Sequence, residues 1–262
     1  MSDNVIYIII AIMILGPIII LFFISANNQK RVKEIEQYAK RNKLSFKKYF
    51  DKFIKDCGNM RCFSEMIDPN FCYVIEKPDK ENGNIYVGEL HWDISVKNHR
   101  RSSSSMYHRE GRECTLCVLY DDGFNLPDFD LLRETLKEKA VEVLGMNQTE
   151  DIDFDDDKDF SDVWWLSSNE NMVVRELFTK NIRSNFMNFV DKGYRICGYR
   201  NVLFIITDKP FWAKDYSKLI SDMRMIQRFM KNNKKFYTPY SEREKEGNEE
   251  EGNEEEGKEQ LS

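Results

Sequence analysis

The sequence predicts an α+β fold, in which an N-terminal transmembrane helix is followed by a mostly antiparallel sheet with packed helices. Three observations predict this class. One segment near the N-terminus is long, apolar and uncharged, several later segments alternate between apolar and polar residues, and others repeat apolar residues at helical spacing. With 262 residues, 41% of them hydrophobic and 13% aromatic, the chain is long and apolar enough to bury a core.

The apolar segment runs from Val5 to Ile24 and contains twenty residues without a charge. At about 1.5 Å per residue it spans roughly 30 Å, the thickness of a bilayer's hydrocarbon. A cleaved signal peptide and a buried core helix are the alternatives. Signal peptides begin with basic residues, whereas Asp3 is the only charged side chain before this run. We therefore expect residues 1–26 to form a short tail and a single transmembrane helix.

The flanking charges predict the orientation of this helix. Lys30, Arg31 and Lys33 follow the apolar run, and no Lys or Arg precedes it. The positive-inside rule then places the N-terminus outside and the C-terminal domain in the cytoplasm of a single-pass cell-membrane protein. Six cysteines in so large and aromatic a chain favour free, mostly buried thiols over a disulfide framework.

Residues 27–56 predict two basic amphipathic juxtamembrane helices. Ten Lys or Arg stand against four Asp or Glu between Asn28 and Asp56, and apolar residues recur at helical spacing on either side of Leu44. One interpretation is that these are solvated faces beside a core. The other is that they contact anionic headgroups of the membrane lipid bilayer. The candidates for that contact are Lys30, Arg31, Lys33, Lys47, Lys48, Lys52 and Lys55.

Residues 57–240 are expected to form the cytoplasmic α+β domain, beginning with strands. Alternating residues predict strands at Phe71 to Lys77, Ile85 to Val96 and Glu113 to Tyr120. In the second strand, Tyr86, Leu90, Trp92, Ile94 and Val96 share one face. The opposite face, with Glu89, His91, Asp93, Ser95 and Lys97, is expected to be half solvated.

The second half of this domain alternates helices and strands. A helix is expected from about Asp130 to Leu144, because Gly145 supplies a stop signal. Short strands follow at Ile152 to Phe154 and around Asp162 to Leu166. The remaining expected elements are helices near Asn169 to Phe178 and Lys180 to Val190, a hairpin turning at Arg200-Asn201, and a last helix over about Asp215 to Lys231.

Residues 160–189 form a module of a phenylalanine-led strand, ending in small polar residues, and two helices with spaced apolar residues. This module resembles one in an uncharacterised bacterial single-anchor membrane protein family, a domain of unknown function with an LLTP-like helix. Lys180 stands where that family often has proline. The resemblance implies an anchored cytoplasmic α+β domain and no catalytic residues. The matching residues are Phe160, Trp164, Ser167, Ser168, Asn169, Val173, Leu177, Phe178, Thr179 and Ile182.

Residues 91–117 contain all three histidines and the one Cys-x-x-Cys of the chain. Side chains three apart in a strand point to opposite faces, so Cys114 and Cys117 cannot bind one metal ion while the strand is extended. The connection from Lys97 to Arg112 reads as a long basic loop. Residues 100–103, RRSS, are a weaker candidate for phosphorylation or anion contact.

An acidic run from Asp151 to Asp162 resembles a calcium loop in its spacing. However, Asp156 occupies the position that requires glycine, and Asp162 stands where the loop needs a bidentate glutamate. The sequence also lacks a G-x-S-x-G elbow, a P-loop and a G-x-G-x-x-G fingerprint. We therefore assign no catalytic, cofactor-binding or metal-binding residues and expect no cofactor.

The net charge of −6 is concentrated at the C-terminus. From Ser241 onward ten Glu stand against three Lys or Arg, so residues 241–262 carry −7 and the preceding residues total +1. This composition predicts a disordered acidic tail, either solvated, or bound to a basic partner or to the basic juxtamembrane segment. A nearly neutral body gives no reason to expect nucleic acid as a partner.

The prediction for function is a membrane-anchored protein that presents a non-catalytic interaction domain in the cytoplasm. Its partner is expected to be another membrane or cytoplasmic protein, or a second copy of the chain. The alternative is a membrane-tethered enzyme with an unrecognised active site, which a concave pocket with converging polar groups would favour.

Overall fold

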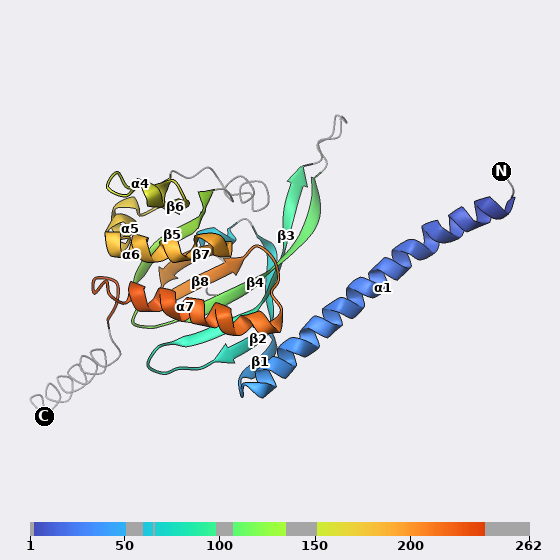
Figure 1. The fold of residues 1–262 in the computed structure, drawn as a ribbon, viewed down its shortest axis with the longest axis horizontal. Helices are drawn as coiled ribbons and strands as arrows, with labels where there is room; N and C mark the ends of the chain where they lie inside the picture. Colours follow the sequence, from blue (N-terminus) through green and yellow to red (C-terminus); the bar gives the residue numbers. More distant parts are fainter. Residues whose placement is uncertain (1–2, 51–59, 65, 98–106, 135–150, 239–262) are drawn as a thin grey trace, which may run out of the picture.

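The structure is a computed structural model that describes residues 3–50, 60–64, 66–97, 107–134 and 151–238 (Figure 1). It confirms the α+β class, because eight strands form one antiparallel sheet in the order β1-β2-β3-β4-β8-β7-β5-β6. The strands are β1 (Ser45–Tyr49), β2 (Ile67–Lys77), β3 (Asn84–Lys97), β4 (Tyr107–Tyr120), β5 (Leu126–Arg133), β6 (Trp164–Ser168), β7 (Tyr194–Arg200) and β8 (Val202–Thr207). The helices are α1 (Asp3–Arg41), η1 (Arg61–Phe63), α4 (Lys158–Ser161), α5 (Asn171–Leu177), α6 (Lys180–Phe186), η2 (Met187–Lys192), η3 (Ala213–Asp215) and α7 (Tyr216–Met230).

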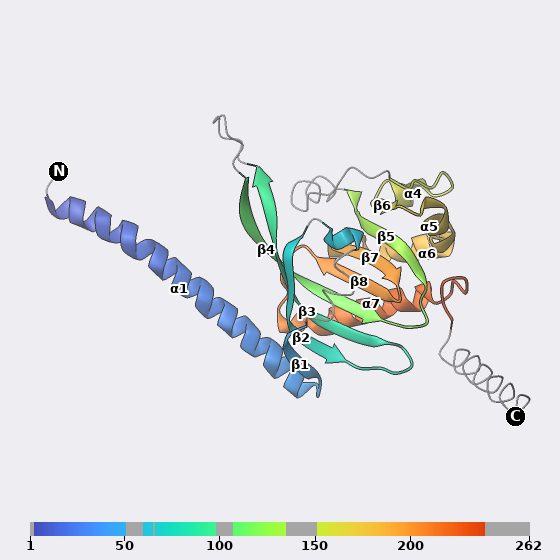
Figure 2. The same cartoon turned by 180° about the vertical axis from the view of Figure 1, so that it is seen from behind.

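The two faces of the sheet bury two separate apolar clusters. The larger cluster lies under α7, the last turns of α1, and α5 and α6, while the smaller cluster on the other face includes η1 (Figures 1 and 2). Strand β3 contributes to both through its alternation: Ile85 and Val87 belong to the larger cluster, and Leu90 and Trp92 to the smaller one. The predicted apolar face of this strand is confirmed.

The expectation that the other face of β3 is half solvated is wrong at Glu89. This side chain is fully buried, because the end of α1 covers the sheet there. His91 and Asp93, farther along the strand, are only partly buried, as expected.

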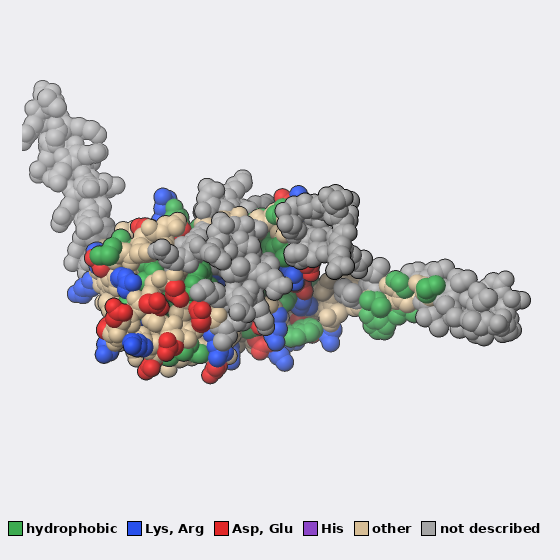
Figure 3. Space-filling model, turned by 90° about the horizontal axis from the view of Figure 1, so that it is seen from above, with side chains coloured by type: hydrophobic (Ala, Val, Ile, Leu, Met, Phe, Trp, Pro, Cys, Tyr) green, Lys and Arg blue, Asp and Glu red, His purple; other side chains and the backbone are tan. Residues whose placement is uncertain are grey.

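Helix α1 is continuous over its 39 residues and leaves the body as a long projection (Figures 1 and 2). Ile35 and Ala39, one turn apart, are buried against the sheet, whereas Phe22 and Phe23 are exposed. Figure 3 shows apolar side chains along the projection, beside a body whose surface mixes acidic and basic groups. Among the residues whose side chains are described, no helix is both long and apolar enough to cross a membrane.

The prediction of a second juxtamembrane helix is wrong for the part of that segment that the structure describes. Residues Ser45–Tyr49 form the edge strand β1, in which Ser45 lies opposite Glu76 of β2. The aromatic spacing that suggested a helix is also compatible with a short strand, and pairing with β2 supplies the backbone hydrogen bonds. The rest of that expected helix, residues 51–56, lies outside the described residues.

The predicted helix from Asp130 to Leu144 is also wrong at its start. Leu126–Arg133 is strand β5, which lies between β6 and β7 and is buried along nearly its whole length. Its sequence, LPDFDLLR, buries Asp130 beside apolar residues, so the apolar–polar alternation that identifies a half-solvated strand is missing. Residues 135–150 lie outside the described residues, as do the predicted tail at 241–262 and the basic motif at 100–103.

The other predicted elements agree more closely with the structure. The hairpin of β7 and β8 turns at Arg200-Asn201, and α5, α6 and α7 lie at the expected positions. Residues 152–154 form no strand of the sheet, although the Ile152 N–H donates to the Leu166 carbonyl at 2.8 Å. Strand β4 begins at Tyr107, well inside the predicted loop of residues 97–112, whereas β3 ends at Lys97. The cysteines within the described ranges, Cys62, Cys72, Cys114, Cys117 and Cys197, are free and buried, as predicted.

Candidate functional site

A cluster of charged side chains around the buried Glu89 lies where the last turns of α1 rest on strands β2 to β4. We call this region the α1 junction. It comprises Arg31, Ile35, Tyr38 and Ala39 of α1, Cys72 of β2, Glu89 and His91 of β3, Glu113 of β4 and Tyr216 of α7.

Arg31 joins the helix to the sheet through two carboxylates. Its Nε lies 2.7 Å from Glu89 Oε1, and its Nη2 lies 3.1 Å from both Glu89 Oε2 and Glu113 Oε2. Burial disfavours the charged guanidinium, but Glu89 and Glu113 outweigh this effect and raise the pKa of Arg31. Because the Glu89 side chain is only 1% exposed, its charge requires a partner at this position.

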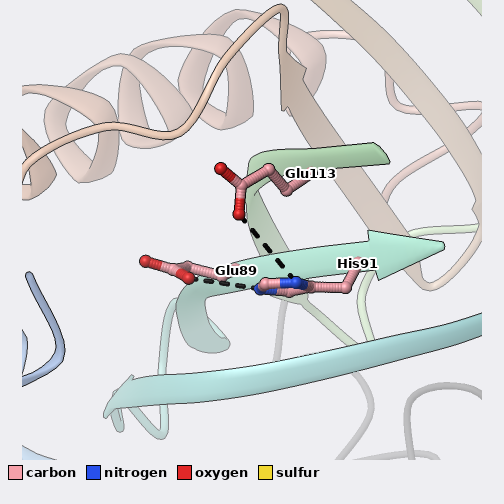
Figure 4. A group of neighbouring side chains, drawn as sticks. All are labelled: Glu89, His91 and Glu113. Carbon is pink, nitrogen blue, oxygen red and sulfur yellow. Dashed lines mark hydrogen bonds and ion pairs between the residues drawn. The ribbon is translucent and has the colours of Figure 1, made fainter. Parts of the chain in front are cut away.

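His91 completes the cluster from the same strand (Figure 4). Its Nε2 lies 3.2 Å from Glu89 Oε2, and its Nδ1 lies 4.0 Å from Glu113 Oε2. Hydrogen bonds with the Cys72 sulfur and the Glu89 carboxylate raise the pKa of His91 to about 10. The imidazole is therefore protonated at neutral pH and cannot serve there as a general base.

Glu89, His91 and Glu113 each place a potential metal-ligating atom within 4.8 Å of the others. Two observations argue that they form an ion-pair cluster instead of a metal site. Arg31 already binds both carboxylates, and metal binding needs a neutral imidazole, which the raised pKa of His91 opposes. The two carboxylates, Glu89 and Glu113, are balanced by the two cations, Arg31 and His91, so the junction has no net charge.

Apolar contacts extend the junction beyond its charges. Ile35 and Ala39 are fully buried in the larger cluster, and the Tyr38 and Tyr216 rings pack edge to face with centroids 6.1 Å apart. Burial raises the pKa of Tyr216. Aromatic pairs of this geometry add about 0.5–1.5 kcal/mol beyond area burial, so the helix is held by packing as well as by charge.

An open hollow of about 420 Å³ adjoins the junction. Arg112 of its lining is engaged with Glu110, at 3.1 Å between Nη2 and Oε2, and Asp68 of its lining lies 2.9 Å from Arg109 Nη1. With His91 protonated, its imidazole is not a base at neutral pH, and two of the carboxylates in the lining, Glu113 and Asp68, are paired with Arg31 and Arg109. The lining residues are Asp68, Asn70, His91, Trp92, Asp93, Gly111, Arg112 and Glu113.

The structure separates the predicted headgroup-contact residues into groups. Lys30 and Lys33 are exposed on α1, whereas Arg31 turns into the junction. Lys47 and Lys48 lie on β1, beyond the C-terminal end of α1, where the Lys47 Nζ is 2.8 Å from Glu76 Oε2. Lys52 and Lys55 lie outside the described residues.

The other candidate sites have structural roles. Cys114 and Cys117 belong to opposite apolar clusters, which confirms that they point to different faces of β4, and burial raises the pKa of both thiols. In the acidic run, Asp156 and Asp157 pair with Arg183 at 2.7 and 2.9 Å. This pairing gives these two acids a role in packing α4 against α6.

Sequence reasoning missed the pairing of Arg31 with Glu89, because the partners are 58 positions apart. One signal was present. Glu89 interrupts a strand in which Ile85 and Val87 on the same face are apolar, and a carboxylate in such a position is usually paired when it is buried.

Comparison with known proteins adds a likeness of fold. No protein-family model matches the sequence, and no curated protein is significantly similar to it. Among solved structures, the crystal structure of the mycobacterial trehalose monomycolate transport factor A, TtfA, superimposes with a TM-score of 0.50. The match covers 80% of this chain and 97% of that chain at 11% identity. At this identity the likeness extends to the fold alone.

Proposed function

We propose that this chain is a single-pass membrane protein whose α1 both anchors it and carries a cytoplasmic α+β domain, and that this domain is a non-catalytic interaction module. The main observation in support is that one uninterrupted helix contains the uncharged run of Val5 to Ile24 and, farther on, Arg31 of the α1 junction. The resemblance of residues 160–189 to a family with a single anchor agrees with this proposal.

Continuity of the helix gives the domain a defined orientation. Arg31 lies seven residues beyond Ile24, which corresponds to about 10 Å along the helix axis. Since the junction holds the sheet at this level through ion pairs and ring packing, the domain cannot swing freely as it would on a flexible linker. A fixed orientation suits a domain that must present one surface to a partner.

The same geometry reduces the set of proposed headgroup contacts. Lys30 and Lys33 are exposed within the first turns after the apolar run. On the strand that follows α1, the Lys47 Nζ already lies 2.8 Å from Glu76 Oε2. We therefore assign the proposed headgroup contact of this segment to Lys30 and Lys33.

The interaction role is proposed for a protein partner in the membrane or cytoplasm, or for a second copy of the chain. The charges of the α1 junction are satisfied internally, and burial raises the pKa of the Cys114 and Cys117 thiols, which disfavours the reactive thiolate. These properties support binding over catalysis.

Membrane extraction of the full chain, carrying a C-terminal epitope tag, tests the anchor. We expect alkaline carbonate to leave the protein in the membrane pellet, and protease added outside spheroplasts to spare the tag. The double variant Ile12→Lys/Leu15→Lys should move to the supernatant, because each lysine near the helix centre costs about 2.5–3.5 kcal/mol of insertion free energy. Asn28→Lys, outside the apolar run, is the matched control. Complete extraction of the unmodified chain would contradict the proposal.

A further inference from the structure

The loop between β8 and α7 presents an exposed tryptophan between two exposed lysines. Trp212 is 36% exposed, and Lys209 and Lys214 on either side of it are exposed as well. An indole is apolar over most of its surface but carries a polar N–H, and tryptophan is for this reason enriched at the membrane–water interface. Lysines beside it complement anionic headgroups.

The backbone of this loop is fixed by hydrogen bonds. The Phe211 N–H donates to Thr115 Oγ1 at 2.7 Å, and Thr207 Oγ1 donates to the Lys209 carbonyl at 2.6 Å. The Trp212 carbonyl accepts from the Asp215 N–H at 2.8 Å as η3 begins. These hydrogen bonds therefore fix the backbone from which the exposed indole projects.

The loop leads into η3, which packs against α1. At its C-terminal end, the Tyr216 ring packs on Tyr38. At its other end, Phe211 is bonded to the β4 position directly opposite Glu89, the carboxylate that Arg31 holds. The Tyr216 side chain also lies beside Thr115, so the segment from Phe211 to Tyr216 lies between the levels of Tyr38 and Arg31.

We propose that Trp212, with Lys209 and Lys214, contacts the headgroup layer of the bilayer. This inference rests on the proposed membrane anchor. The level of Arg31 is about 10 Å from Ile24 along the helix, and a helix tilt of about 20° toward the domain would bring the loop closer still. Together with the exposed Lys30 and Lys33 of α1, the loop gives the domain a second contact with lipid, which fixes its rotation about the anchor.

Tryptophan fluorescence of the full chain in vesicles tests this contact. The chain has four tryptophans, and Trp92, Trp164 and Trp165 are no more than 7% exposed, so quenching by headgroups reports Trp212. The vesicles contain phosphatidylcholine and phosphatidylserine, with and without a nitroxide on the choline headgroup. We expect the nitroxide to quench the unmodified chain and to have little effect on Trp212→Phe. Lys209→Glu/Lys214→Glu should reduce the quenching.

A second variant separates contact with lipid from simple exposure. Met225 is 43% exposed on α7, which leads away from the junction (Figure 1). In Trp212→Phe/Met225→Trp, the only exposed indole is moved to this site, and we expect the nitroxide to leave it unquenched. Alkaline extraction of the same vesicles distinguishes the two proposals. A chain that resists extraction but is quenched no more than Trp212→Phe overturns this inference alone, and a chain that is extracted overturns the anchor and this inference with it.

Discussion

Two buried arginine–carboxylate pairs perform different tasks in this molecule. Arg195 and Asp130 join neighbouring strands β7 and β5 inside the sheet, with Nε–Oδ1 and Nη2–Oδ2 distances of 2.8 and 2.5 Å. Arg31 and Glu89 join a projecting helix to the sheet at comparable distances. The first pair is enclosed within one folded unit, whereas the second connects two parts that could separate.

Their surroundings explain this difference. Arg195 and Asp130 have no second ion pair among the described residues, since only the Cys197 thiol also reaches Asp130 Oδ1, at 3.4 Å. Glu89 also has His91, and Arg31 has Glu113, so each member of that pair keeps one partner if the other is lost. A pair whose members each keep a second partner can be broken at a lower cost than one buried alone, because no buried charge is left uncompensated.

Arg195→Met is expected to have the largest effect, because it leaves Asp130 buried without a cation. Loss of one partner from a buried pair costs about 3–5 kcal/mol of unfolding free energy. Urea unfolding of the full chain in detergent micelles, followed by tryptophan fluorescence, measures it. Arg200→Met, at an exposed position of the same strand, is the control and should change stability by less than about 0.5 kcal/mol. A loss below about 1 kcal/mol for Arg195→Met would contradict the argument.

Arg31→Ala should have a smaller and more local effect. His91 still faces Glu89, so we expect about 2 kcal/mol of lost stability, of the order of a charged hydrogen bond. Amide hydrogen exchange should become faster in residues 31–41 and remain unchanged in β7 and β8. Lys33→Ala, two residues away and exposed, should change neither.

The double variant Arg31→Ala/Glu89→Gln sharpens this comparison. In Arg31→Ala the buried Glu89 carboxylate keeps only His91 and loses both bonds to the guanidinium, and a neutral amide is less costly to bury in that state, so Glu89→Gln should restore part of the stability that Arg31→Ala removes. If exchange in residues 31–41 is equally fast in the single and double variants, the charge of Glu89 is not what holds the helix.

The two pairs also show what the sequence can predict. The alternation of Tyr86, Leu90, Trp92 and Ile94 identified β3 and its apolar face, because side-chain direction in a strand is a local property. Asp130 misled the same reasoning, since a polar residue before an apolar run resembles a helix start. Its partner Arg195 is 65 positions away in the sequence, and no local sequence pattern indicates such a pairing. The α1 junction was not predicted for the same reason, because Arg31 and Glu89 are 58 positions apart in the sequence.

The pH dependence of the junction should be weaker than either substitution. The folded pKa of His91, about 10, lies above the usual value of 6.5, so its stabilising contribution is complete below about pH 6.5 and is lost as the pH rises toward 10. Because the ring is 38% exposed, solvent limits the effect to less than about 1 kcal/mol. Urea unfolding between pH 6 and 10 should show a steeper loss for the unmodified chain than for His91→Gln. Parallel curves would show that the imidazole carries no charge in the junction.

Lys47→Ala tests the opposite extreme, an ion pair at the surface. Lys47 Nζ lies 2.8 Å from Glu76 Oε2, but its side chain is 43% exposed on an edge strand. Exposed pairs contribute about 0–1 kcal/mol, and salt screens them, so we expect a change below about 0.5 kcal/mol that disappears at high ionic strength. The N–O distance is close to the 2.7 Å between Arg31 and Glu89, so the comparison holds geometry nearly constant and varies burial. If Lys47→Ala destabilised the chain as much as Arg31→Ala does, burial could not be what makes the α1 junction strong.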